Sequence, residues 1–191
     1  MSKNSGDDII SMLSPGERKL LEVLSVEGEC DGETLSKKTD MDLVSVSRNA
    51  LWLSNKKLVD IRKEPYDVYE LSSLGAHYLQ HGLPERILFG YLIKMKKVDK
   101  ENLTSIGLSN DELNAAIGIL SKSNIVRISK ENDRLYLILL SEDDIVIKNN
   151  ENALNAVNRG EPYERSTLET LCKRKILSKK TLHRLYISLT E

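Results

Sequence analysis

The stretch that decides the fold runs from Asp31 to Leu71, DGETLSKKTDMDLVSVSRNALWLSNKKLVDIRKEPYDVYEL. Its first part predicts two helices joined by a turn. The second helix carries apolar residues at helical spacing, which indicates one buried face made of Leu43, Val46, Ala50 and Leu53. Leu35 and Met41 belong to the same predicted core.

The period of the sequence changes after residues 55–57. Residues 58–61 and 66–71 then predict two strands, with Lys63-Glu64-Pro65 as the turn between them. Upstream, Ser14-Pro15-Gly16-Glu17 predicts a helix start, because Ser suits the N-cap and Pro the first helical position. The whole order is that of a winged helix-turn-helix.

The same unit returns later in the chain. A shift of 67 residues places apolar residues on apolar residues: Met41 on Leu108, Val46 on Leu113, Ala50 on Ile117 and Leu53 on Leu120. A shift of 118 residues predicts a third, weaker copy, with Leu58 on Ile176 and Val59 on Leu177.

The predicted fold class is therefore α+β and helix-rich, with three tandem small winged helix-turn-helix units, one inserted in another. The expected organisation is a disordered tail at 1–10, unit 1 at 11–82, unit 2 at 83–92 plus 143–191, and an inserted unit 3 at 93–142.

Charge is distributed unevenly along the chain. The formal net charge is −1, but residues 1–82 carry 10 basic and 14 acidic side chains, whereas residues 149–191 carry 8 and 5. A basic run near the C-terminal end favours that end as the contact for a polyanion. Its candidate nucleic-acid-binding residues are Lys173, Arg174, Lys175, Lys179, Lys180 and Arg184. Tyr186 and His183 adjoin the run, and basic residues interleaved with aromatic ones can hold a phosphate backbone and stack a base. The alternative interpretation is an ordinary solvated strand face.

The second helix of the first copy offers two further candidates, Arg48 and Asn49. In DNA-binding winged helices this helix enters the major groove, where Arg and Asn can contact base edges. The competing interpretation is a solvated face with Trp52 packed on a neighbouring unit. The matching face of the second copy, Ala115, Ala116 and Ile119, cannot read a groove and indicates a packing surface.

Several function classes receive no support from the sequence. The glycines are scattered singly, no triad-like spacing points to catalytic residues, and the two cysteines and three histidines make no metal-ligand pattern. No apolar run reaches about 18 residues, so no membrane span is expected. The cysteine usage favours a reducing cytoplasm.

The quoted features together resemble a known family. LSPGERKLL at the start, GLPERILFGYL at Gly82–Leu92 and LETLCKRKILSKKTLHRLYISL at Leu168–Leu189 look like the N-terminal extension of the phenylalanyl-tRNA synthetase α chain, of the archaeal and eukaryotic-cytosolic type. The resemblance extends over nearly all of the chain from Leu13.

This resemblance implies a tRNA-binding appendage. It implies a class II catalytic domain elsewhere in the parent enzyme, with ATP and Mg as cofactors and a β chain as partner in an (αβ)2 assembly. No cofactor is expected in this chain, and the chain alone is expected to be inactive. Two other functions remain open: a winged-helix transcription regulator that binds duplex DNA, and a protein-interaction scaffold.

Overall fold

The computed structural model describes residues 12–190, so the tail predicted at residues 1–10 lies outside the described residues. The fold is α+β and rich in helix, as predicted. Its elements follow in this order: α2 (Pro15–Glu27), β1 (Cys30–Asp31), α3 (Gly32–Thr39), α4 (Leu43–Asn55), β2 (Val59–Leu71), α5 (Ser73–His81), α6 (Pro84–Met95), β3 (Lys97–Asp99), the 3-10 helix η1 (Lys100–Ile106), α7 (Asn110–Lys122), β4 (Val126–Glu131), β5 (Arg134–Leu139), α8 (Ile145–Arg159), α9 (Arg165–Lys173) and β6 (Leu177–Leu189).

Residues 12–190 divide into two compact units. The first unit contains residues 12–68 and 181–190, and the second unit contains residues 69–180. The chain passes between the units within strands β2 and β6.

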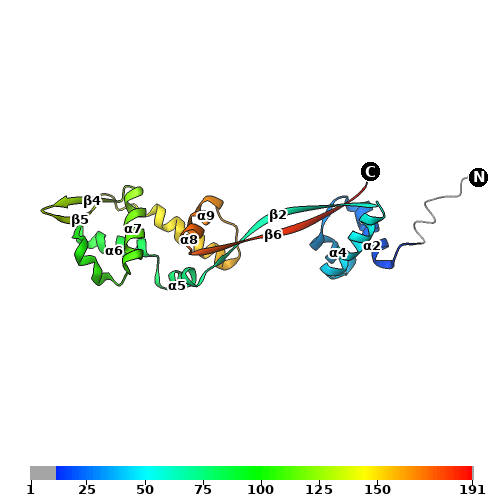
Figure 1. Ribbon diagram of the computed structural model, residues 1–191, viewed down its shortest axis with the longest axis horizontal. Helices are drawn as coiled ribbons and strands as arrows, with labels where there is room; N and C mark the ends of the chain where they lie inside the picture. The colour runs from blue at the N-terminus through cyan, green and yellow to red at the C-terminus, as the bar shows by residue number, and fades with distance from the viewer. Residues whose placement is uncertain (1–11, 191) are drawn as a thin grey trace, which may run out of the picture. The chain divides into compact units, whose positions relative to one another are not determined.

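In the first unit, α2 packs against both α3 and α4, and α2 and α4 lie side by side (Figure 1). Strand β6 lies between β1 and β2, and Cys30 pairs with Ile187. The core consists of Leu13, Leu20, Leu24, Cys30, Leu35, Val46, Ala50, Leu53, Val59 and Ile187. The predicted core residues Leu35, Val46, Ala50 and Leu53 are confirmed, but Leu43 is 51% exposed, so its predicted burial is wrong.

The predicted helix start at Ser14 is confirmed in atomic detail. The Ser14 hydroxyl accepts a hydrogen bond from the Glu17 amide, and the Ser14 amide donates to the Glu17 carboxylate at 2.7 Å. Helix α7 begins with the same capping box, made by Ser109 and Glu112. Both boxes satisfy backbone amides that a helix start would otherwise leave unpaired.

The predicted turn at Lys63-Glu64-Pro65 is wrong. Strand β2 continues through these residues from Val59 to Leu71, and its hydrogen-bonded neighbour is β6. Since β2 is an edge strand of its sheet, Pro65 can sit in it without breaking an internal ladder. Pairing with β6, which lies near the C-terminal end of the sequence, therefore keeps these residues in a strand despite the local turn signal.

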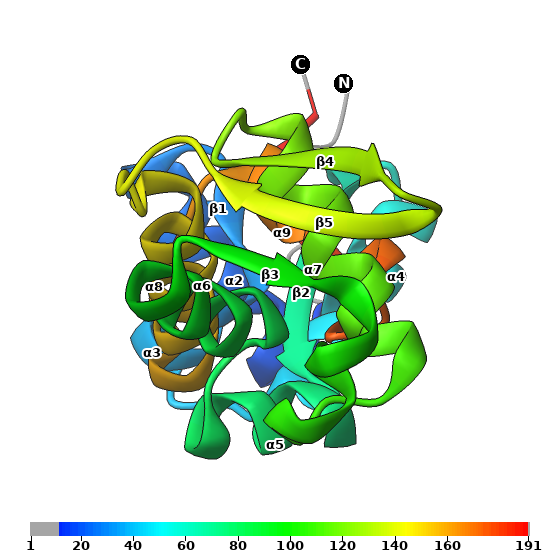
Figure 2. The same cartoon turned by 90° about the vertical axis from the view of Figure 1, so that its left-hand side faces the viewer.

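The second unit holds two hydrophobic cores. One lies between α6, η1, α7 and the sheet of β3, β5 and β4, and it also takes in Ile147 of α8. Figure 2 shows β5 in the middle of that sheet. The other core joins α5, α8, α9 and the start of β6 through Tyr78, Leu83, Ala153, Leu154, Leu168, Leu171, Ile176 and Leu177.

The element order repeats at the spacing that the sequence predicts. Helices α4 and α7 begin at Leu43 and Asn110 and end at Asn55 and Lys122, each pair 67 residues apart. Their sheets have matching orders, β1-β6-β2 and β3-β5-β4, with the last strand of each set in the middle. The elements from α2 to β2 with β6 are hereafter the first region, and those from α6 to β5 the second region.

The predicted unit boundaries differ from this division in two respects. Residues 69–82 were expected in unit 1, yet they belong to the second unit. Residues 181–190 were expected to belong with residues 143–180, yet they pack with the first unit. The reason is that β6 pairs with β1, which places the fully buried Ile187 in the core of the first unit. The division of residues 69–180 into smaller modules remains a prediction.

Candidate nucleic-acid interface

The basic run begins where helix α9 ends. Lys173 is the last residue of α9, Arg174 is its C-cap, and Lys175 has a left-handed backbone with φ of 59°. The chain turns here because Leu171 and Ile176, on either side, are both buried. Basic side chains at a helix C-terminus also interact favourably with the negative end of the helix dipole.

Arg174 is not available to a ligand as the sequence suggested. Its Nη1 and Nη2 donate to the two oxygens of Glu85 at 2.7 and 2.8 Å, and only 18% of the arginine side chain is exposed. Glu85 is fully buried and also accepts a hydrogen bond from Asn150. A bidentate pair to a buried carboxylate uses the arginine for structure, so the expectation that Arg174 faces a polyanion is corrected.

The four lysines of the run lie at the surface of the second unit. Lys173, Lys175, Lys179 and Lys180 are exposed and form what we call the lysine surface. Lys180 forms an ion pair with Glu70 at 2.6 Å. Arg165, followed by Lys179 and Lys173, holds the pKa of the neighbouring Glu169 below its usual value. Glu169 is thus charged, but the four lysines outnumber the acidic neighbours Glu70 and Glu169.

Arg184 belongs to the first unit and lies in strand β6. Its guanidinium is 4.9 Å from the centre of the Tyr66 ring. A hydrogen bond with the Tyr186 hydroxyl raises the pKa of Arg184, so the side chain keeps its charge. The sequence identified Arg184 but missed Tyr66, because the pairing of β2 with β6 could not be read locally.

Helix α4 carries the last two candidates, Arg48 and Asn49. Arg48 is exposed, as expected. Asn49 is 8% exposed and accepts a hydrogen bond from the Ser14 hydroxyl, while its amide donates to the Ser45 carbonyl at 2.8 Å. A Cβ added at Gly16 would lie within 2.9 Å of Asn49. Asn49 therefore tethers the start of α2, and its predicted place on the exposed face is wrong.

The exposed faces of α4 and α7 differ in character. Around Arg48, helix α4 exposes Val44, Leu51 and Trp52 at 67%, 56% and 46%. On α7, Ala116 is fully buried, so only part of the predicted docking face Ala115, Ala116 and Ile119 can be a surface. On α4 the exposed Arg48 is thus surrounded by apolar side chains, and the α7 face has no arginine or asparagine at the positions of Arg48 and Asn49.

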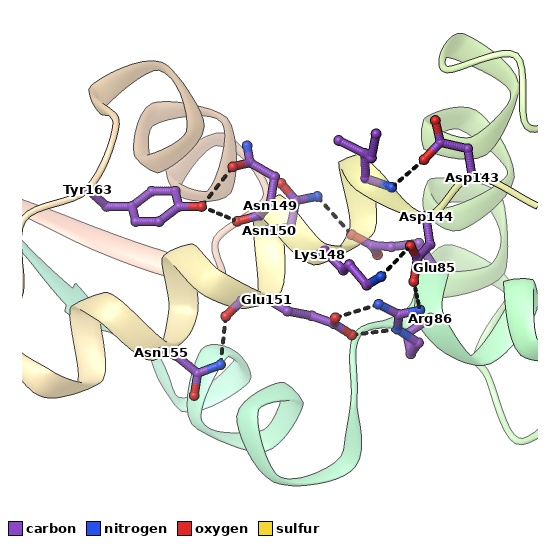
Figure 3. A network of polar contacts seen from close by, with 11 residues as sticks. Glu85, Arg86, Asp143, Asp144, Lys148, Asn149, Asn150, Glu151, Asn155 and Tyr163 are labelled. Carbon is purple, nitrogen blue, oxygen red and sulfur yellow. Dashed lines mark hydrogen bonds and ion pairs between the residues drawn. The ribbon is translucent and has the colours of Figure 1, made fainter.

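A polar network joins α6 to α8 in the second unit (Figure 3). The Arg86 guanidinium donates to Glu151 at 2.6 and 2.7 Å and to Asp144 at 2.9 Å. Lys148 also pairs with Asp144 at 2.9 Å. Arg86, followed by Lys148, lowers the pKa of Asp144. These charges are satisfied within the unit, so the network is a structural clamp.

Other chemistry finds little support in the part of the chain that the structure describes. Within residues 12–190, no group of three or more His, Cys, Asp or Glu side chains could hold a metal ion. His77 and His81 stack on each other, with ring centres 4.3 Å apart. No helix in the same residues is long and apolar enough to span a bilayer.

Comparison with known proteins finds several relatives that share part of their sequence with this chain. No protein-family model matches the chain. The phenylalanine–tRNA ligase α subunit of Methanopyrus kandleri is 28% identical over 138 residues, which are 71% of this chain and 26% of that protein. The α subunits of Thermococcus onnurineus and Pyrococcus furiosus are 36% and 32% identical over 105 and 126 residues, or 55% and 66% of this chain. The matches cover 21% to 26% of the length of these relatives.

Proposed function

We propose that this chain binds tRNA as part of the α subunit of a phenylalanine–tRNA ligase. The observation that carries the proposal is its similarity to archaeal proteins of that name. The lysine surface supplies the chemistry, because tRNA is a polyanion and exposed lysines neutralise phosphates. It lies in the second unit, which carries 17 basic and 15 acidic side chains in residues 69–180.

The scaffold proposed for this role is a set of winged-helix units. The first and second regions each supply three helical segments and a three-stranded sheet in the same order. Helices α8 and α9, with the ends of β2 and β6, form a third and shorter unit. Such units commonly bind nucleic acid through basic side chains on a helix or a wing.

The chemistry of ligation is assigned to other parts of the parent protein. By resemblance, a catalytic domain that uses ATP and Mg, and a β chain in an (αβ)2 assembly, are the expected partners. The proposal for this chain therefore concerns recognition, and its test is a binding measurement.

The test replaces the lysine surface by glutamates. In the variant carrying Lys173→Glu, Lys175→Glu, Lys179→Glu and Lys180→Glu, we expect binding of a phenylalanine tRNA transcript to fall at least about tenfold at low salt. The slope of log affinity against log salt should decrease by roughly 0.7 to 0.9 for each lost phosphate contact. Fluorescence anisotropy over a salt titration measures both quantities.

A control with the same change in charge separates local contact from net charge. It carries four Lys→Glu changes at exposed positions outside the lysine surface, Lys19, Lys37, Lys94 and Lys122. Equal losses in both variants would reject the lysine surface as the contact. If the unaltered chain prefers duplex DNA to tRNA at matched salt, the transcription-regulator alternative is favoured instead.

A further inference from the structure

In the first unit, the paired strands β2 and β6 carry arginines and tyrosines on one face. Arg62 and Tyr66 share a face of β2, and Arg184 and Tyr186 share a face of β6, because side chains alternate along a strand. The Arg62 guanidinium lies 4.8 Å from the centre of the Tyr186 ring, and Arg184 lies 4.9 Å from that of Tyr66. These cross-strand contacts place all four side chains on the same face.

The two pairs differ in how their arginines are engaged. Arg62 forms an ion pair with Glu29 at 2.6 Å and another with Glu64. Arg184 is exposed and contacts the ring of Tyr66 and the hydroxyl of Tyr186, while Glu33 acts on it at longer range. Of these two arginines, Arg184 is therefore the one that is not held in a carboxylate ion pair. Its neighbour Tyr66 is 36% exposed.

Comparison with the second region shows which of these cation–tyrosine contacts occurs in both regions. There Tyr136 pairs with Asp99 in the sheet, just as Tyr186 pairs with Asp31, and Lys97 lies 4.5 Å from its ring centre. A cation over this tyrosine is thus common to both regions. The position 67 residues after Tyr66 is Asp133, in the turn between β4 and β5. The pair of Tyr66 and Arg184 has no counterpart there.

We propose that Tyr66 and Arg184 form a stacking site for an unpaired base of RNA. The inference rests on the proposed tRNA-binding function and assigns a second, different kind of contact to the first unit. Every base has a π face that can stack on an aromatic ring or a guanidinium plane. A base within a duplex has both faces covered, so the site selects unpaired nucleotides.

The experiment uses the full chain and an oligouridylate of about eight nucleotides, within the usual site size of single-strand binders. A second version of the oligonucleotide carries one 2-aminopurine, whose fluorescence is quenched when it stacks. A blunt RNA duplex with the same number of phosphates reports on backbone contact alone. Tyr66→Ala should weaken binding of the single strand about 5- to 150-fold and abolish the quenching.

Two further variants show whether stacking is the cause. Tyr66→Phe keeps the ring and should bind within about twofold of the unaltered chain, since stacking needs no hydroxyl. Arg184→Lys keeps the positive charge but loses the planar guanidinium on which a base can stack. It should therefore reduce the quenching clearly, while the slope of log affinity against log salt changes little. Duplex binding should stay unchanged in all three variants.

The result that overturns the inference is an unaltered affinity and unaltered quenching in Tyr66→Ala, or an equal loss for duplex and single strand. That outcome leaves the proposed function in place if the lysine-surface variant still loses tRNA binding. If instead the unaltered chain fails to bind tRNA, the proposed function fails, while quenching of the oligouridylate probe still reports on the stacking site by itself.

Discussion

The first and second regions have the same element order and sheet order but close their sheets differently. In the second region, β4 and β5 are joined by Asn132 and Asp133, both with positive φ, as a tight hairpin turn requires. In the first region, residues 72–176 separate β2 from β6. The matching sheet orders show that the place of the middle strand depends on which side chains it buries, and not on the length of the connection.

The two regions also satisfy a buried acid in different ways. Each first helix has a buried glutamate in its first turn, Glu17 in α2 and Glu85 in α6. Glu17 pairs at 2.7 Å with Lys56, the C-cap of α4 in the same region. Glu85 pairs with Arg174, the C-cap of α9, outside the second region. The first region is thus self-contained in this respect, whereas the second depends on its neighbour within the unit.

Breaking these two acid pairs should give the largest effect. Arg174→Ala leaves the fully buried Glu85 without its cation, and we expect a loss of about 3 to 5 kcal/mol in the free energy of unfolding. Lys56→Ala should cost only about 1 to 2 kcal/mol, because Glu17 keeps its hydrogen bonds with Ser14. Urea unfolding measures both losses.

The matched control is Lys175→Ala, which changes an exposed neighbour of Arg174. Hydrogen exchange should localise the effect of Arg174→Ala to α6, α8 and α9. Equal destabilisation by Arg174→Ala and Lys56→Ala would contradict the difference that we draw between the two regions.

The next test concerns the middle strands. Ile187 of β6 and Leu137 of β5 are both fully buried at the centre of their sheets. Replacing either by Ala should cost about 2 to 5 kcal/mol. Despite its place near the C-terminal end, Ile187→Ala should increase amide exchange in α2 and α4, whereas Leu137→Ala should act on α6 and α7.

Leu189→Ala, at a side chain that is 41% exposed, is the control for β6 and should have a clearly smaller effect. If Ile187→Ala leaves exchange in α2 and α4 unchanged, β6 does not complete the first region in solution.

A smaller effect is expected from the capping box of α7. The Ser109 amide, followed by the Tyr78 hydroxyl, lowers the pKa of Glu112 from its ordinary value of 4.5. A lowered folded-state pKa contributes stability above the unfolded value, which is lost as the pH falls through the folded value. Glu112→Gln should therefore lose less stability between pH 7 and acidic conditions than the unaltered chain does.

Urea midpoints at both ends of that pH range measure this difference. Tyr78→Phe removes one of the three hydrogen bonds that the Glu112 carboxylate accepts, so its acid sensitivity should lie between those of the unaltered chain and Glu112→Gln. If all three proteins lose the same stability on acidification, ionised Glu112 does not contribute to the stability of α7.

Local signals in the sequence predicted the helices well and the long-range strand pairing poorly. Ser14-Pro15-Gly16-Glu17 marks a helix start because capping depends on neighbours within one turn. The turn expected at residues 63–65 failed because a proline signal carries no information about a strand more than 100 residues away. Asn49 and Arg174 were misplaced for a related reason, since their partners Ser14 and Glu85 lie 35 and 89 residues away.

The sequence by itself determined the helix-rich α+β class, the caps, the apolar faces and the repeat at 67 residues, because each depends on spacing within a helix or along the chain. Only the tertiary structure decided that β6 completes the first region, that Arg174 neutralises a buried acid, and that Tyr66 meets Arg184. These contacts depend on apolar side chains such as Ile187, whose burial brings distant segments together and thereby sets which charges meet.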